Sequence, residues 1–243
     1  MSFIAKTDKS ALITGASSGI GKATALEFAK AGINLALVSR DPEKLEAVAQ
    51  AAIEAGVKAK AYILDLAEVE QVRSKISAIA SDFGSIDILV NNAGMGYTNT
   101  LSDTSLIDWQ QVINLNLTSV FQCIQGILPM MRDRGQGTII NVASIAAKQV
   151  FPQWGAYSVS KFGIMALSKT LAAEERAYGI RVTAIYPGSV NSSLWDTETV
   201  KANFDRSAML TPEVVAQSIL HTTLLPASAV IEELILMPNV GTF

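Results

Sequence analysis

The chain has 243 residues, of which 49% are hydrophobic and 17% are charged, so it can bury the core of one large α/β domain. Its formal net charge of -3 creates no field that would recruit nucleic acid or an anionic membrane surface, and neither partner is expected. The single cysteine, Cys123, excludes an intrachain disulfide framework and a cysteine-built metal site, and it fits a reducing, cytoplasmic compartment.

The amino terminus and the hydropathy pattern predict a soluble protein. Charges at Lys6, Asp8 and Lys9 interrupt the amino terminus before an apolar segment develops, so a signal peptide is not expected. No run approaches the roughly 18 apolar residues that span a bilayer. The lone histidine, His221, has no cysteine or acidic cluster near it in the sequence, so no metal site is expected.

Short apolar runs alternate with longer helical patterns along the whole chain. The expected strands are 11–14, 34–39, 58–64, 86–91, 138–142, 180–186 and 233–237, and the expected helices are 19–31, 42–55, 69–83, 106–131, 157–178 and 212–225. Strand followed by helix, repeated about six times, implies parallel pairing with right-handed crossovers. The nearly all-apolar strands indicate helices on both faces of the sheet.

This pattern predicts an α/β fold with a doubly wound parallel sheet of about seven strands. No linker, low-complexity segment or internal repeat marks a second domain, so residues 1–243 are expected to form a single domain. The irregular stretch over residues 188–210 is long for a passive loop, and we expect it to act as a lid.

A glycine-rich turn joins the first strand to the first helix. Gly15, Gly19 and Gly21 surround Ser17 and Ser18 there. Their missing side chains allow a tight turn and a close approach to a pyrophosphate, which the helix amino terminus attracts. The alternative is a structural turn without a ligand. The position between strand and helix favours a dinucleotide site of the Rossmann type.

The end of the second strand predicts which nicotinamide cofactor binds. An NAD site usually places an acid there, whereas an arginine accommodates the 2′-phosphate of NADP. Here Ser39 and Arg40 end the strand and no acid precedes Asp41. Arg40 could instead be a solvated loop residue beside Asp41 and Glu43. The pattern favours NADP over NAD.

Four further side chains form a candidate catalytic group. Tyr157 and Lys161 are four residues apart on a predicted helix and therefore share one face. Ser144 follows the fifth strand, at a carboxyl end where open α/β sheets bind ligands. Asn116 lies in the middle of a helix that is otherwise apolar on its buried side, where an amide is an unfavourable filler.

The ordered set of motifs resembles the short-chain dehydrogenase/reductase superfamily in its single-domain form, over essentially the whole chain. The motifs are Gly15-x-x-x-Gly19-x-Gly21, Asn91-Asn92-Ala93-Gly94, Asn116, Ser144, Tyr157-x-x-x-Lys161 and Pro187-Gly188. The resemblance implies an NADP-dependent oxidoreductase that reduces a ketone, an aldehyde or a 3-oxoacyl group to an alcohol.

The resemblance also implies a role for each catalytic candidate. Tyr157 would be the general acid in reduction, and Lys161 would stabilise its phenolate and hold the nicotinamide ribose hydroxyls. Ser144 would hydrogen-bond the substrate oxygen. Asn116 would keep an ordered water for a proton relay toward Lys161.

Other residues are expected at the cofactor by the same resemblance. Asp65 would accept from the adenine amino group beside Leu66, although Asp65 could also cap the helix that follows. Ser192 stands where a threonine is more usual. The remaining positions are Asn91, Asn92, Ala93 and Gly94 on the adenine-ribose side, Pro187 and Gly188 beside the nicotinamide, and Ile20 and Val190 around it.

The substrate pocket is expected to be apolar and aromatic, which suits a hydrophobic carbonyl compound better than a small polyol. Met95, Trp154 and Trp195 are the main candidates beside Ser144 and Tyr157. Further candidates are Tyr97, Phe151, Phe204 and Met209, each of which could instead simply pack the loops. The motifs resemble the 3-oxoacyl-carrier-protein reductases, whereas the carboxyl-terminal residues are more similar to the 3-hydroxy acid dehydrogenases.

Helices 106–131 and 157–178 resemble the pair that forms the dimer interface in this family, so a homodimer or homotetramer is expected. Two other classes compete with the reductase prediction. One is a non-catalytic dinucleotide sensor, which typically lacks the tyrosine or the lysine. The other is an isomerase or epimerase, whose relatives usually carry a longer substrate domain.

Overall fold

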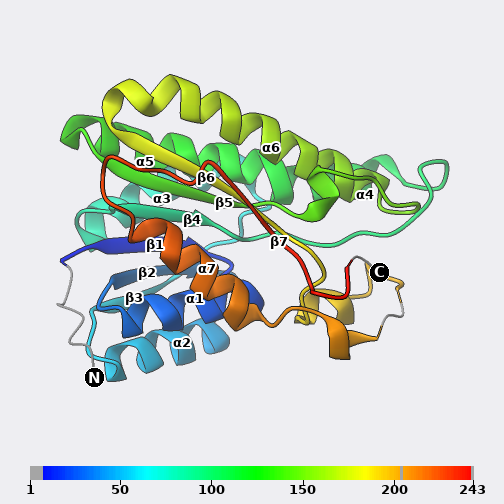
Figure 1. Cartoon of the computed structure of the whole chain (residues 1–243), viewed down its shortest axis with the longest axis horizontal. Helices are drawn as coiled ribbons and strands as arrows, with labels where there is room; N and C mark the ends of the chain where they lie inside the picture. The colour runs from blue at the N-terminus through cyan, green and yellow to red at the C-terminus, as the bar shows by residue number, and fades with distance from the viewer. Residues whose placement is uncertain (1–7, 203–204, 242–243) are drawn as a thin grey trace.

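The computed structural model describes residues 8–202 and 205–241. Within these residues, seven parallel strands form one sheet in the order β3-β2-β1-β4-β5-β6-β7 (Figure 1). The strands are β1 (Ser10–Thr14), β2 (Asn34–Ser39), β3 (Ala59–Ile63), β4 (Ile88–Asn91), β5 (Gly137–Val142), β6 (Ile180–Pro187) and β7 (Glu233–Leu236). The predicted doubly wound α/β fold is confirmed.

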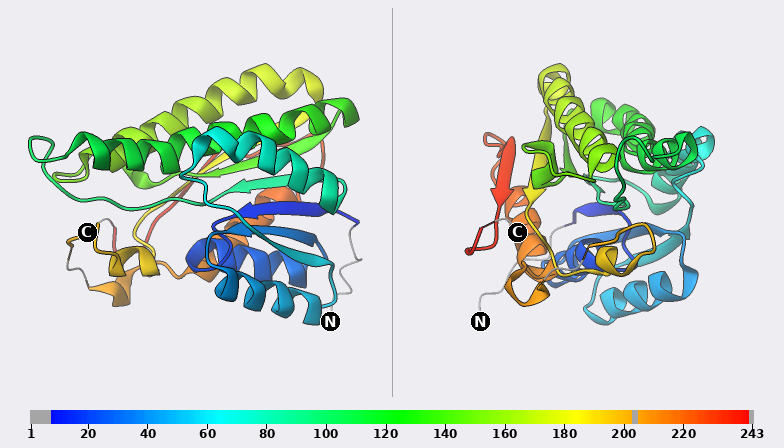
Figure 2. Two further views of the ribbon diagram at one scale, coloured as in Figure 1. Left: turned by 180° about the vertical axis from the view of Figure 1, so that it is seen from behind. Right: turned by 90° about the vertical axis from the view of Figure 1, so that its right-hand side faces the viewer.

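Helices cover both faces of the sheet (Figure 2). They are α1 (Gly19–Lys30), α2 (Pro42–Glu54), α3 (Val69–Phe83), α4 (Leu106–Ile113), α5 (Ser119–Arg134), α6 (Gly155–Glu175) and α7 (Pro212–Thr223). Helices α1, α2 and α7 lie on one face, and α3, α4, α5 and α6 lie on the other. No helix in the described part of the chain is long and apolar enough to cross a bilayer.

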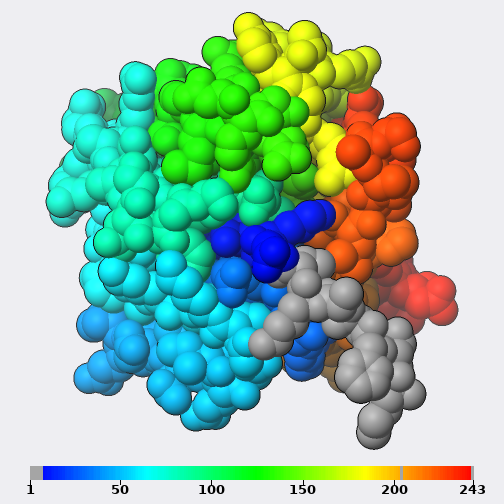
Figure 3. Space-filling model, turned by 90° about the vertical axis from the view of Figure 1, so that its left-hand side faces the viewer, coloured from blue at the N-terminus to red at the C-terminus, as the bar shows by residue number. Residues whose placement is uncertain are grey.

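Both faces of each central strand are buried, which explains the nearly all-apolar strand sequences. In β1, the side chain of Leu12 joins the core under α3 and α5, whereas Ile13 joins the core under α1 and α7. Both side chains are fully buried. Seen from the end of the molecule where the described chain begins, β1 (blue) lies between these two helical layers (Figure 3).

The predicted helix over residues 106–131 is interrupted. Residues Asn114–Thr118 form a π-helical turn between α4 and α5, and α5 continues to Arg134. Asn116, at the centre of this turn, is buried and bonds the backbone of Met95. The local change in winding therefore coincides with a polar tertiary contact, which is typical of π-turns near functional sites.

Residues 188–210 contain two short 3-10 turns, Ser193–Asp196 and Arg206–Ala208. The segment closes at its base, where Asn191 N donates to Leu210 O over 2.9 Å. It also contacts the segment after β4, because Thr199 Oγ1 donates to Gly96 O over 2.7 Å. In Figure 1 this segment (yellow to orange) lies at the carboxyl end of the sheet.

Candidate active site

Two adjoining cavities open at the carboxyl end of the sheet. The strand order reverses between β1 and β4, and such switch points are where open α/β sheets bind ligands. The first cavity, which we call the groove, runs from the turn after β1 past the ends of β2 and β3 to Lys161. The second, which we call the pocket, lies between Ser144 and Trp195. Ile20 and Tyr157 line both cavities.

The glycine turn shapes one end of the groove. Gly15 adopts a positive φ of 64°, and a Cβ there would stand 2.9 Å from the Cα of Ala93. A Cβ on Gly21 would overlap the carbonyl oxygen of Gly15, so Gly21 lies behind the groove and allows close packing. Helix α1 begins at Gly19, and its N-cap Ser18 makes no side-chain capping bond. The first-turn N–H groups therefore have no side-chain cap, which fits a bound phosphate.

The end of β2 forms the next part of the groove. The hydroxyl groups of Ser17 and Ser39 are 2.8 Å apart. Arg40 is exposed at the groove. Its guanidinium forms no ion pair with any residue in the described ranges 8–202 and 205–241. Asp41 instead caps α2 and pairs with the Lys44 ammonium at 2.9 Å, and these contacts lower the pKa of its carboxyl. The acid nearest Arg40 in sequence is thus directed toward α2.

Asp65 and Leu66 line the groove after β3. The carboxylate of Asp65 accepts from Ala67 N at 2.9 Å, closing a turn. Helix α3 begins later, at Val69, with Glu68 as its N-cap. Asp65 is therefore not the helix cap that the alternative reading of the sequence proposed.

The Asn-Asn-Ala-Gly segment after β4 divides its side chains between the core and the groove. Asn91 is buried and donates to the Asn141 side chain over 2.9 Å. Asn92 donates to the carbonyl oxygens of Thr14 and Gly15 over 3.0 and 3.3 Å, which ties β4 to the glycine turn. Three residues of this segment line the groove: Asn92, Ala93 and Gly94.

Asn116 supports the site from behind. Its Oδ1 accepts from Met95 N at 2.8 Å, and its Nδ2 donates to Met95 O at 2.9 Å and to Ser160 Oγ at 3.1 Å. Ser160 Oγ in turn donates to the carbonyl oxygen of Tyr157 over 2.6 Å. The amide thus links the segment after β4 to the helix that carries Tyr157, and its side chain lines neither cavity.

Ser144, Tyr157 and Lys161 meet where the groove joins the pocket. Burial raises the pKa of Tyr157, and a hydrogen bond with Ser144 opposes this shift. The Lys161 ammonium lies 5.6 Å from the centre of the Tyr157 ring and donates to Val142 O over 3.1 Å. Burial lowers the pKa of Lys161 to about 8. Three of the predicted catalytic residues are therefore together: Ser144 follows β5, and Tyr157 and Lys161 lie on α6.

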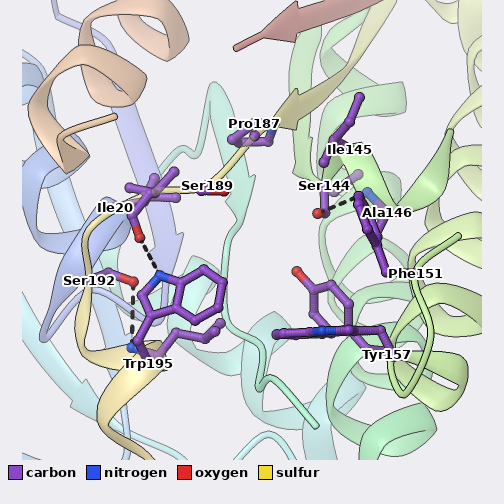
Figure 4. A pocket seen from close by; sticks show the side chains of 15 residues that line it. Ile20, Ser144, Ile145, Ala146, Phe151, Tyr157, Pro187, Ser189, Ser192 and Trp195 are labelled. Carbon is purple, nitrogen blue, oxygen red and sulfur yellow. Dashed lines mark hydrogen bonds between the residues drawn. The ribbon is translucent and has the colours of Figure 1, made fainter. Parts of the chain in front are cut away.

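The pocket has two facing walls (Figure 4). One wall follows β5 and includes Ser144, Phe151 and Tyr157, and the other consists of Ile20 and the segment after β6. Among the described residues, the lining consists of Ile20, Ala143, Ser144, Ile145, Ala146, Phe151, Trp154, Tyr157, Pro187, Gly188, Ser189, Val190, Ser192, Leu194 and Trp195. Sequence reasoning missed Ala143, Ile145, Ala146, Ser189 and Leu194, and the signal available for them is their position beside predicted residues.

Some predicted substrate residues lie elsewhere. Met95 lines the groove rather than the pocket. Tyr97 is buried against Val112 and Ala156, and its hydroxyl donates to Asp108 over 3.2 Å. Met209 is buried and is not part of the pocket lining. Phe204 lies outside the described residues.

Aromatic side chains form a continuous contact across the pocket. The Trp154 ring stands edge-on to Tyr157 at 5.2 Å and to Trp195 at 5.8 Å between ring centres. The indole N–H of Trp195 donates to Val190 O over 2.7 Å. The described residues hold no cluster of three potential metal ligands, and His221 is exposed on α7.

Comparison with known proteins identifies the family. The family model described as short chain dehydrogenase matches residues 9–203. The chain therefore belongs to the short-chain dehydrogenase family, in its single-domain type, and it is an oxidoreductase of that family.

Two reductases that the chain matches over most of their own length are similar in sequence. The 3-oxoacyl-acyl-carrier-protein reductase FabG of Staphylococcus aureus is 39% identical over 192 residues, which is 79% of this chain and 78% of FabG. The sepiapterin reductase of Chlorobaculum tepidum is 34% identical over 95% of this chain and 96% of its own length. The chain also matches the glycine betaine reductase ATRR of Emericella nidulans at 33% identity, but it spans only 19% of that protein.

A solved structure is similar over almost the whole chain. The alcohol dehydrogenase of the archaeon Thermococcus sibiricus, complexed with 5-hydroxy-NADP, has a TM-score of 0.87 and 29% sequence identity. The match covers 96% of this chain and 97% of the dehydrogenase.

Proposed function

We propose that this protein is an NADP-dependent reductase that converts a ketone or aldehyde to an alcohol. The observation that carries the proposal is the meeting of Ser144, Tyr157 and Lys161 at the boundary between the groove and the pocket. A substrate in the pocket would have its carbonyl oxygen beside the Ser144 and Tyr157 hydroxyls, on the side that adjoins the groove. The names of its reductase relatives support the same reaction class.

The groove suits a dinucleotide with a 2′-phosphate. Its glycine turn and the uncapped first turn of α1 provide N–H donors for a pyrophosphate. Ser39 and Arg40 would hold the 2′-phosphate, because a guanidinium supplies several charge-assisted donors. The neighbouring Asp41 carboxylate pairs with Lys44 and so does not occupy the Arg40 guanidinium. Reduced NADP bound there would supply the hydride. The similar alcohol dehydrogenase, solved with an NADP derivative, supports this choice of cofactor.

Tyr157 would be the proton donor. Burial raises the pKa of its phenol, which keeps the proton in place until the substrate oxygen accepts it. Ser144 would donate a hydrogen bond to the same oxygen and polarise the carbonyl. Lys161, buried close by, would stabilise the phenolate that remains and would donate to the ribose hydroxyls of the cofactor.

The other residues would position these groups. Asn116 and Ser160 would fix the start of α6 relative to Met95, so that Tyr157 is held in register. Asp65 and Leu66 would contact the adenine, and Pro187, Gly188, Val190 and Ser192 would surround the nicotinamide. One domain over residues 1–243 would carry both sites, and residues 188–210 would be its lid.

The test is NADPH oxidation at 340 nm by the purified protein with a panel of ketones, aldehydes, diketones and β-keto thioesters. Tyr157→Phe is expected to lower kcat at least 10³-fold while NADPH still binds, because the variant keeps the ring and loses only the proton donor. Binding can be followed by the change in NADPH fluorescence. Equal turnover by the variant would refute the role of Tyr157, and a silent panel with intact NADPH binding would favour the non-catalytic sensor.

A further inference from the structure

The lining of the pocket contains one ionisable side chain, the phenol of Tyr157. The other described side chains that line it are aliphatic, aromatic or hydroxyl groups. The cavity of the pocket has a volume of about 140 Å³ and is open to solvent on one side. Arg40, Asp65 and Lys161, the charged side chains of the adjoining groove, lie among the residues assigned to the cofactor. A carboxylate in the pocket would therefore lose its hydration without gaining a charged partner.

Two of the cations that flank the pocket along the chain, Lys148 and Arg206, are already paired, whereas the exposed Lys201 of the 188–210 segment belongs to none of the ion pairs of the described residues. Lys148, beside the β5 wall, contacts Glu233 at 2.7 Å. Arg206, at the end of the 188–210 segment, pairs with Asp196 at 2.6 Å. Hydrogen bonds from Lys148 and Tyr186 lower the pKa of the Glu233 carboxyl to about 2, so Glu233 stays charged and keeps Lys148 paired over the physiological range. Neither of these two cations is free to attract an acidic substrate or an acidic carrier protein, and Lys201 is not among the described residues that line the pocket.

The aromatic wall is held in place by backbone contacts. Gln153, just before Trp154, has a positive φ of 68°, which side chains other than glycine rarely adopt. Its carbonyl accepts from Asn99 N at 2.8 Å, which secures the turn. On the opposite wall, the indole of Trp195 is fixed by its bond to Val190 O. A preformed aromatic surface binds apolar rings with little loss of conformational entropy.

We infer that the substrate is an uncharged ketone that carries an aromatic or alicyclic group, and that the pocket rejects carboxylates and acyl groups on an acidic carrier. The inference rests on the proposed function. Ser144 and Tyr157 hold the carbonyl, and the apolar group lies against Phe151, Trp154 and Trp195. The nature of the pocket, rather than the motifs shared with FabG, then defines specificity.

The experiment compares methyl benzoylformate with benzoylformate, which share a phenyl ketone and differ in the negative charge. Wild-type protein with NADPH is expected to reduce the ester with a kcat/KM at least 100-fold above that for the acid. Trp195→Arg places a cation on the pocket wall and is expected to lower this ratio at least 10-fold. Leu106→Arg adds the same charge on α4 outside the pocket, where the side chain is exposed, and is expected to leave the ratio unchanged. The ester and the acid differ in intrinsic reactivity toward hydride, but this difference is the same for all three proteins. It therefore cancels when the ester-to-acid ratios of kcat/KM are compared between the proteins.

Acetoacetyl-coenzyme A serves as the probe for acyl-carrier substrates. If wild-type protein reduces this thioester or benzoylformate as well as the neutral ester, the inference is overturned while the reductase function stands. If Trp195→Arg does not fold, Phe151→Arg, which places the same charge on the opposite wall, takes its place in the comparison. If no carbonyl compound of either kind is reduced, the inference and the proposed function both fail.

Discussion

At the scale of a single side chain, Arg40 is the residue that we propose to distinguish NADPH from NADH. It is exposed at the groove, while its neighbour Asp41 pairs with Lys44. Arg40→Ala is expected to raise the KM for NADPH about 10- to 100-fold, since a hydrogen bond to a charged group contributes roughly 1.5–3 kcal/mol. The KM for NADH should change less than about twofold.

Arg176→Ala is the matched control, because this exposed arginine pairs with Glu232 and does not line the groove. Steady-state kinetics with both cofactors give the measurement. An equal rise in the two KM values would show that Arg40 does not contact a 2′-phosphate, and a wild-type preference for NADH would contradict the choice of cofactor.

The buried ammonium of Lys161, to which we assign a catalytic role, is expected to reduce the stability of the fold. Burial lowers its pKa from an ordinary 10.5 to about 8, so the folded protein binds fewer protons than the unfolded chain between these values. The free energy of unfolding therefore rises with pH through that window, and below about pH 8 the buried charge has its full destabilising effect.

Lys161→Met is expected to raise the free energy of unfolding at pH 7 by about 2 kcal/mol, from the shifted pKa less the lost bond to Val142. Reduction should be abolished in the same variant. Urea unfolding at pH 7 and at about pH 10.5 gives the measurement, and the gain is expected to vanish at the higher pH. A loss of stability at pH 7 would contradict this account.

At the scale of helices and strands, Gly126 determines how closely α5 approaches α3. A Cβ at this position would stand 2.9 Å from both the Arg73 carbonyl oxygen and the Cγ2 of Ile76. Gly126→Ala is expected to lower the free energy of unfolding by about 1–3 kcal/mol, because the overpacking outweighs the better helix propensity of alanine. Asp133→Ala, at an exposed position of α5, should stay within about 0.5 kcal/mol of wild type.

Urea unfolding of the two variants measures the difference. Equal free energies of unfolding for the two variants would show that α3 and α5 can move apart without loss of stability.

Some helices and strands have bounds that the apolar pattern of the sequence predicts correctly. Strand β2 and helix α3 have the predicted bounds, because apolar periodicity and the flanking residues are local signals. The π-turn at residues 114–118 was not predicted. It depends on Asn116 bonding Met95, a contact between segments 21 residues apart that no local periodicity encodes.

At the scale of the whole molecule, the exposed faces of α5 and α6 are consistent with the expected assembly. Phe121 and Val159 on these helices are 41% and 47% exposed. We propose that the protein forms a homodimer or homotetramer through this pair of helices. Light scattering of the purified protein is expected to give the mass of two or four chains.

The double variant Phe121→Glu with Val159→Glu is expected to give smaller species, since buried unpaired charges disfavour an interface. Ile53→Glu, at a similarly exposed residue of α2, is the control and should leave the mass unchanged. A monomeric wild type would contradict the proposed assembly.

The fold of this protein and the kinds of side chain at its candidate site could be predicted from the amino-acid sequence. Alternating strands and helices, all-apolar strands and an ordered set of motifs are properties of neighbouring residues, so they can be read without coordinates. They predicted the doubly wound sheet, the family, and the meeting of Ser144, Tyr157 and Lys161.

The directions in which the loop side chains point became known from the three-dimensional structure. Met95, Tyr97 and Trp154 look equivalent in the sequence, yet one lines the groove, one is buried in the core and one lines the pocket. The physical reason is that loop conformations are set by contacts with distant segments, such as those of Asn99 with Gln153 and of Thr199 with Gly96. Composition and spacing carry no information about those contacts.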